Sequence, residues 1–270
     1  MAYDKRISRA APGLVVSALD DSGSMAGPLP GTSDAKYEWV ERDHGHIFKE
    51  LLARSTEQRG DSVVIKPRYY VYLIRYGSMP EAWAPEELDI EAAVTKYAAA
   101  GNSLGLGGHL GGTDAEAALR LAREFLKKAV ACERYRNSFP PLVFHLTDGM
   151  SQSDATQVAE DIMALTTADG NVLMVNGYIG TQTSLSYTGP EDFPGYVTEK
   201  EAGPSEDNLR LFRMSSLMPE CIRQNLVDDG IFPAIREGAR LFFDVRTKEM
   251  LKHTIQVVGS MGSRADRTRT

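Results

Sequence analysis

Residues 13–24 read GLVVSALDDSGS. The first seven form an apolar run with the length and β-branched content of a buried parallel strand. The residues that follow predict a tight loop carrying the carboxylate of Asp20 and the hydroxyls of Ser22 and Ser24. These are hard oxygen donors of the kind that Mg²⁺ and Mn²⁺ prefer. Because Asp, Ser and Gly are also ordinary turn residues, the stretch alone indicates either a metal loop or a plain turn.

Two later stretches favour the metal loop. Residues 142–149, LVFHLTDG, predict a second apolar strand that leads into Asp148. Residues 111–114, GGTD, place the Thr113 hydroxyl just before a helical pattern. The Asp-x-Ser-x-Ser loop, the threonine and the end-of-strand aspartate stand in this order along the chain. Together they resemble the metal-ion-dependent adhesion site of von Willebrand factor type A domains.

The resemblance covers residues 13–258 and carries expectations about fold and site. It implies a Rossmann-like, doubly wound α/β fold whose mainly parallel sheet has about six strands flanked by helices. It also implies that the strands ending at Asp20 and Asp148 are neighbours where the strand order reverses. There Ser22, Ser24 and Thr113 would bind Mg²⁺ or Mn²⁺ directly, and Asp20 and Asp148 would act directly or through water.

The pattern along the rest of the chain independently indicates an α/β fold, because predicted strands alternate with predicted helices. Residues 62–65 and 69–76 predict either a hairpin at the sheet's edge or one long interrupted strand. Residues 181–204 predict a long exposed loop. The remaining predicted strands are 171–179 and 241–245, and the predicted helices are 35–57 (with Asp34 as N-cap), 87–99, 114–129, a helix capped by Ser153 or Asp154 and running to 167, 206–224 and 248–258.

Composition bounds the class of protein. The chain has 270 residues, 42% of them hydrophobic and 25% charged, with no shift that would divide it. We expect one domain over residues 13–258, a lead-in over 1–12 and a disordered tail over 259–270. The net charge of −7 argues against a nucleic-acid partner. The two cysteines indicate no disulfide framework and favour a reducing compartment. Residues 1–12 do not read as a signal peptide, and no apolar run could span a membrane, so we expect a cytoplasmic location without a membrane partner.

Thr113 has a second interpretation. Thr113-x-x-Glu116 is a capping-box pattern, and position alone favours the cap over the metal role. The glycine-rich residues 101–112 lack a Gly-Lys-Ser/Thr ending and follow a helix, which argues against a phosphate-binding loop. We expect them to form a flexible loop that lets Thr113 approach a metal. His145 interrupts an apolar strand and is interpreted as a core histidine.

The resemblance also implies a function. A metal bound by few charged ligands stays electrophilic and favours an anionic oxygen, so we expect a non-catalytic module that binds an Asp or Glu of a partner protein. Without a signal peptide, the chain resembles the intracellular bacterial members, including the tellurium-resistance type, that work beside kinases, phosphatases or AAA-type ATPases. One alternative is a Mg²⁺-dependent phosphohydrolase, although Ser22 replaces the second aspartate of the Asp-x-Asp pair used by haloacid-dehalogenase-type phosphatases. The other is a scaffold that binds no metal.

Overall fold

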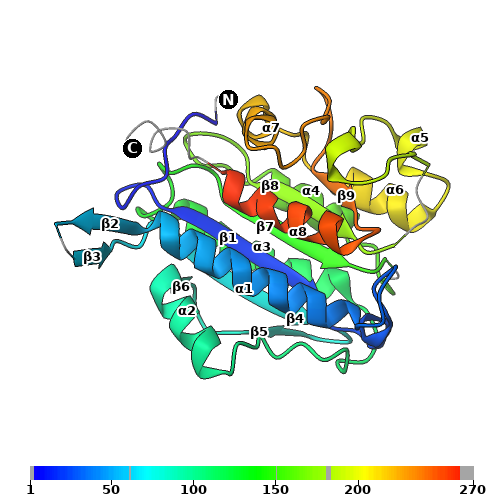
Figure 1. Cartoon of the computed structure of the whole chain (residues 1–270), viewed down its shortest axis with the longest axis horizontal. Helices are drawn as coiled ribbons and strands as arrows, with labels where there is room; N and C mark the ends of the chain where they lie inside the picture. Colours follow the sequence, from blue (N-terminus) through cyan, green and yellow to red (C-terminus); the bar gives the residue numbers. More distant parts are fainter. Residues whose placement is uncertain (1–2, 61, 150, 181–183, 262–270) are drawn as a thin grey trace.

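The central strand of the molecule is β1 (Gly13–Asp20), which is buried along its whole length. A computed structural model describes residues 3–60, 62–149, 151–180 and 184–261 (Figure 1). In it β1 pairs in parallel with β4 (Tyr69–Tyr76) on one side and with β7 (Leu142–Thr147) on the other. A central strand that is buried along its whole length is mainly apolar, which accounts for the run that the sequence shows, and Ser17 is the polar residue within it.

The main sheet has seven strands and is mainly parallel. Its order is β5-β4-β1-β7-β8-β9, with β6 also paired to β4. Only β5 (Pro80–Ala82) and β6 (Leu88–Asp89) run antiparallel, whereas β8 (Leu173–Tyr178) and β9 (Phe242–Asp244) continue the parallel part. The predicted mainly parallel α/β fold is confirmed. The sheet exceeds the expected six strands because the two-residue β6 adds to one edge.

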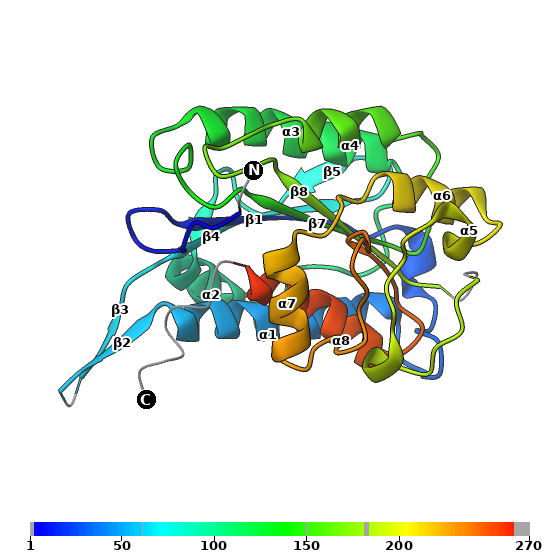
Figure 2. The same cartoon turned by 90° about the horizontal axis from the view of Figure 1, so that it is seen from above.

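Helices cover both faces of the sheet, as Figure 2 shows. On one face lie α1 (Lys36–Arg54), α2 (Ile90–Ala99) and α8 (Lys248–Gln256), and on the other lie α3 (Ala115–Ala131) and α4 (Thr156–Met163). Side chains of β1 alternate between the two layers: Val15 and Leu19 join the core beneath α1, while Val16 and Ala18 join the core beneath α3.

The segment after α1 departs from the prediction. The helix ends at Arg54, and β2 (Thr56–Arg59) then pairs antiparallel with β3 (Ser62–Ile65) in a separate two-stranded sheet. A left-handed φ of 59° at Gly60 allows the tight reversal between them. Residues 62–65 therefore form neither a hairpin with 69–76 nor one interrupted strand. Asp34 is not the N-cap of α1, since Ala35 holds that position.

The C-terminal third also differs from the prediction. Residues 206–224 form two helices, α6 (Glu206–Arg213) and α7 (Glu220–Asp228), because Pro219 precedes the second and cannot lie inside a helix. The described part of 181–204 is mostly loop, as expected, but it contains η2 (Pro190–Asp192) and α5 (Glu199–Ala202) and is not exposed throughout. Phe193 and Tyr196 anchor this part, since both are fully buried and lie against the aromatic rings of β9.

Several predicted boundaries also shift, and the helix expected from residue 87 begins at Ile90. The helix expected to run to 167 ends at Met163, and its N-cap is Ala155 rather than Ser153 or Asp154. The disordered tail was expected to begin at residue 259, but η3 (Val257–Ser260) and Met261 are buried, so the ordered part extends at least to Met261. Residues 262–270 of that tail lie outside the described residues.

A substitution at Leu146 tests whether this residue belongs to the core beneath the predicted site. Its side chain on β7 is fully buried. We expect Leu146→Ala to lower the free energy of unfolding by about 2–5 kcal/mol, because the change leaves a cavity. Urea denaturation measures the loss. The control is Leu217→Ala, the same change at a side chain that is 62% exposed. Equal losses for the two variants would contradict the assignment of Leu146 to the core.

Candidate metal site

The candidate site lies at the carboxyl ends of β1 and β7. The chain passes from β1 to β4 on one side and returns to β7 on the other, so the strand order reverses between β1 and β7. Ligands of open α/β sheets bind at such a reversal. Asp20 is the last residue of β1, and Asp148 follows β7 directly. The structure therefore makes neighbours of the two predicted strand ends.

Hydrogen bonds connect four of the five predicted residues. The hydroxyls of Ser22 and Ser24 lie 3.1 Å apart, and the Ser24 hydroxyl donates to Asp148 Oδ1 at 2.9 Å. The Ser22 backbone N–H donates to Asp20 Oδ1 at 2.9 Å. Asp20, Ser22, Ser24 and Asp148, from two distant parts of the sequence, thus form one hydrogen-bonded series, which we call the oxygen line.

The Asp20 carboxylate is fully buried. Its second oxygen accepts a hydrogen bond of 2.6 Å from the Thr147 hydroxyl. Burial nevertheless raises the pKa of Asp20, because the loss of water outweighs the hydrogen bonds from Ser22 and Thr147, and the nearby Asp148 adds to the rise. A cation at this end of the sheet would offset the electrostatic cost of the two carboxylates.

Thr113 is not the cap of α3. The Asp114 side chain is the N-cap and accepts from the backbone N–H of Ala117 at 3.0 Å, so the capping-box interpretation is wrong. Thr113 is buried, and its hydroxyl makes no hydrogen bond to any residue that the structure describes. The Gly23 N–H donates to the Gly111 carbonyl at 3.0 Å, which holds the segment before Thr113 against the loop that carries Ser22 and Ser24.

Asp21 has a different role from Asp20. Its Oδ1 accepts from the backbone N–H groups of Gly107 and Gly108 at 2.7 and 2.6 Å. Gly108 adopts φ of +64°, and a Cβ there would lie 2.8 Å from the backbone nitrogen of Ala26. Asp21 therefore clamps the glycine-rich loop against η1 (Gly23–Ala26).

A second carboxylate holds the same loop. Glu41 on α1 accepts from the N–H groups of Leu104 and Leu106, both at 2.9 Å. We expected glycine to make residues 101–112 flexible. In the structure two carboxylates accept hydrogen bonds from the middle of the loop, and at Gly108 glycine permits the close approach of two backbones.

Lys36 belongs to the site, and sequence reasoning missed it. Its Nζ lies 2.8 Å from Asp148 Oδ2 and donates to the Ser24 carbonyl at 3.3 Å. One signal was present in the sequence. Lys36 opens a predicted helix, where a positive charge is unfavourable because the helix N-terminus itself carries partial positive charge.

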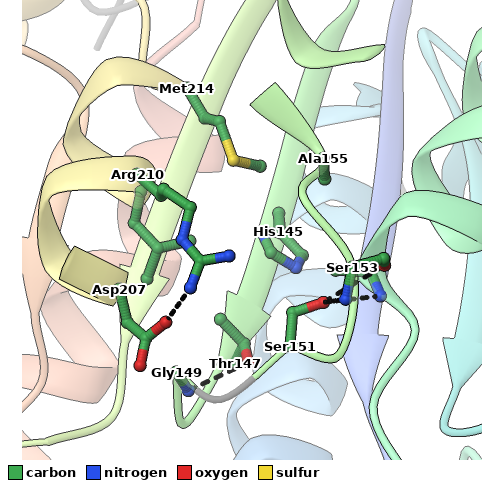
Figure 3. Close-up of a pocket in the computed structure, with 11 residues that line it drawn as sticks. His145, Thr147, Gly149, Ser151, Ser153, Ala155, Asp207, Arg210 and Met214 are labelled. Atoms are coloured by element: carbon green, nitrogen blue, oxygen red, sulfur yellow. Dashed lines mark hydrogen bonds and ion pairs between the residues drawn. The ribbon is translucent and has the colours of Figure 1, made fainter. Parts of the chain in front are cut away.

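A pocket adjoins Thr147 and is lined by β7, the segment that leads into α4, the start of α3, and α6 (Figure 3). His145 lines it, and burial lowers the pKa of this histidine to about 4. His145 Nδ1 contacts Asn176 Oδ1 at 2.8 Å, and Nε2 contacts the Tyr76 hydroxyl at 2.7 Å. Since an amide oxygen only accepts, Nδ1 donates and Nε2 accepts from Tyr76. His145 is thus a neutral core histidine with both ring nitrogens in use, as expected.

The residues present fit a hard divalent cation. The oxygen line consists of hydroxyl and carboxylate oxygens, the donors that suit Mg²⁺ or Mn²⁺. The Lys36 ammonium group already places a positive charge beside Asp148, where a metal cation would lie. Among the described residues, no group of three or more His, Cys, Asp or Glu side chains could hold a metal, so a metal at this site would depend on the serine and threonine hydroxyls.

Comparisons with known proteins bear on the fold. No protein-family model matches the chain, and no curated protein matches it. Among solved structures, pilus adhesin SpaC from Lactobacillus rhamnosus GG aligns over 95% of this chain and 31% of SpaC, with 12% identity and a TM-score of 0.56. The chain shares its fold with this part of SpaC.

Two further structures are similar at lower scores. A von Willebrand factor type A protein from Catenulispora acidiphila covers 93% of this chain and 43% of its own, with 14% identity and a TM-score of 0.49. Proximal thread matrix protein 1 from the mussel byssus, described with a zinc-occupied metal-ion-dependent adhesion site (MIDAS) motif, is also similar. The match covers 92% of this chain and 47% of that protein, with 11% identity and a TM-score of 0.49. The chain spans less than half the length of any of the three proteins. Within the described residues, no helix is both long and apolar enough to cross a membrane.

The Asp21 clamp predicts a local change. Asp21→Ala leaves the N–H groups of Gly107 and Gly108 without their acceptor, so we expect their amide hydrogen exchange to accelerate. Asp21→Asn keeps one side-chain oxygen and should preserve most of the protection. Exchange measured by NMR or mass spectrometry gives the comparison. Unchanged protection in Asp21→Ala would show that other contacts hold the loop.

Proposed function

We propose that this protein is a metal-dependent protein-binding module. It holds one Mg²⁺ or Mn²⁺ ion with Asp20, Ser22, Ser24, Thr113 and Asp148, and through that ion it binds an acidic side chain of a partner protein. The observation that supports this most strongly is the oxygen line, which brings Ser24 and Asp148 to 2.9 Å across 124 positions of sequence. The same residues carry the resemblance to the adhesion site of von Willebrand factor type A domains.

The donor chemistry supports recognition of an anion. Ser22, Ser24 and Thr113 contribute neutral hydroxyls, and only Asp20 and Asp148 contribute charge, directly or through water. A bound divalent ion would supply a positive centre that these ligands neutralise only in part. Mg²⁺ has six positions to fill with oxygen, and a carboxylate is the anionic oxygen that proteins most often offer.

We propose that the module is not an enzyme. His145 on β7 has both ring nitrogens hydrogen-bonded in the core, so it is not free to act as a general base for a water at the site. No observation specifically favours the phosphohydrolase alternative. The scaffold that binds no metal is the competing hypothesis for the titration below.

The cellular setting is part of the proposal and rests on the sequence resemblance alone. We propose a cytoplasmic bacterial protein of tellurium-resistance-like type that acts in a stress or signalling system. Its partner would be a kinase, a phosphatase or an AAA-type ATPase of the same system.

Metal titration tests the ligand set. We expect calorimetry to detect about one weak Mg²⁺ or Mn²⁺ site, because neutral hydroxyls and water supply most of the oxygens. Ser22→Ala combined with Ser24→Ala should abolish it. Ser62→Ala, at an exposed serine on β3, is the control and should bind as the wild type does. Equal binding by the double variant and the wild type would refute the assigned ligands.

Partner capture tests the function. We expect a pull-down from the native lysate to recover a partner with Mg²⁺ and to lose it with EDTA. Thr113→Ala should weaken partner recovery more than metal affinity, because the other ligands retain the ion. Thr113→Ser keeps the hydroxyl and should restore recovery. The same partners in the presence and absence of EDTA would favour the metal-free scaffold, and turnover of a generic phosphate ester would favour the phosphohydrolase.

A further inference from the structure

The cation that the structure itself supplies to the site is Lys36. Its Nζ lies 2.8 Å from Asp148 Oδ2, while the other oxygen of that carboxylate accepts from Ser24. The Asp148 side chain is only 5% exposed and that of Lys36 is 18% exposed, so water screens the pair less than it screens a surface ion pair. The ammonium group also donates to the Ser24 carbonyl, so it connects the loop after β1 with the end of β7.

The location of Lys36 is unfavourable for the helix that carries it. Lys36 is the first residue of α1, where unpaired N–H groups give the helix end a partial positive charge. The position would stabilise an aspartate or glutamate, and Glu38 in the same turn follows that preference. A residue that breaks a local rule at a functional edge is expected to serve the site, and here its contacts are Asp148 and Ser24.

Lys36 and a metal ion would compete for the carboxylate of Asp148. Asp20 and Asp148 bring two negative charges, and Lys36 neutralises one of them. A divalent ion that uses Asp148 meets a carboxylate already paired with an ammonium group. Two cations near one carboxylate repel each other, so the arrival of one weakens the hold of the other.

We propose that Lys36 is a built-in competitor of the metal ion. In the metal-free protein its ammonium stands in for the cation at Asp148 and keeps the oxygen line assembled. A divalent ion displaces the ammonium from Asp148, so the metal affinity is lower than the oxygen donors alone would provide. The inference rests on the metal site of the proposed function, and it adds that the site fills only when the metal concentration is high enough to displace the lysine.

The direction of one mutational effect separates this proposal from a positioning role. If Lys36 competes, its removal raises metal affinity. If Lys36 instead holds Asp148 in place for the metal, its removal lowers metal affinity. The matched control is Lys49, an exposed lysine on the same helix, so Lys49→Met changes the net charge equally without touching the site.

The experiment is calorimetric titration with Mn²⁺ and with Mg²⁺ alone. We expect Lys36→Met and Lys36→Gln to bind at least about fivefold more tightly than the wild type, from the strength of a partly exposed ion pair. Lys36→Arg keeps the positive charge and should bind as the wild type does, and Lys49→Met should stay within about twofold of it, since distant exposed charges are screened. Melting temperatures give an independent readout: the two neutral variants should melt lower than the wild type without metal and gain more from Mn²⁺.

Each outcome decides a different claim. Unchanged or weaker binding in folded Lys36→Met and Lys36→Gln, with a wild type that binds metal, overturns the competitor and leaves the metal site standing. Equal gains in Lys36→Met and Lys49→Met would show a net-charge effect and also overturn it. Binding by the neutral variants but not by the wild type supports the competitor. No binding by any variant refutes the metal site of the proposed function, and the competitor with it. Two neutral variants, one of them able to hydrogen-bond, guard against a folding defect in either.

Discussion

The pairing of β1 on both sides, with β4 and with β7, is the interaction on which the rest of the structure depends. Helices cover both faces of this central strand, so its side chains are mainly apolar, with buried Ser17 as an exception beside His44, and its carboxylate stands at the strand end. The chain then leaves β1 toward one side of the sheet and returns on the other. Asp20 and Asp148 meet because of that return, although neither residue carries any local signal for the other.

The end of β1 also explains why two adjacent aspartates act differently. Asp20, the last residue of the strand, belongs to the oxygen line through the Ser22 N–H and also accepts from the Thr147 hydroxyl. Asp21, one residue later, binds the backbone of Gly107 and Gly108. One carboxylate serves the site, and its neighbour holds the loop that leads to Thr113. Both are fully buried, so each depends on its hydrogen bonds to offset the loss of water.

The helices contribute to the site through their first turns. The α3 helix is capped by Asp114, which leaves the hydroxyl of Thr113 free of the capping role. The α1 helix brings Lys36 to Asp148 at an electrostatic cost to its own N-terminus. Asp114 thus meets the preference of a helix N-terminus, whereas at Lys36 the contact with Asp148 accounts for the residue that is present.

How much the sequence predicts depends on the range of the interaction involved. Local patterns were enough for the apolar strands β1 and β7, for the α/β class and for the polar residues that follow each strand, because strand burial and turn chemistry act over a few residues. The boundary at Pro219 was missed although proline is a local helix-breaking signal, and the partly buried segment of Phe193 and Tyr196 was missed because distant aromatic contacts hold it.

Tertiary structure alone decided three features of the site: the contact of Ser24 with Asp148, the choice of Asp114 over Thr113 as the cap, and the ion pair that draws Lys36 to Asp148. The first and third of these join residues that are more than a hundred positions apart, and the second was a choice between two adjacent residues that both suit a cap. The sequence by itself determined which chemical groups the chain could offer at the ends of its strands. The order of the strands in the sheet determined which of them meet, because only the folded sheet sets the distances between them.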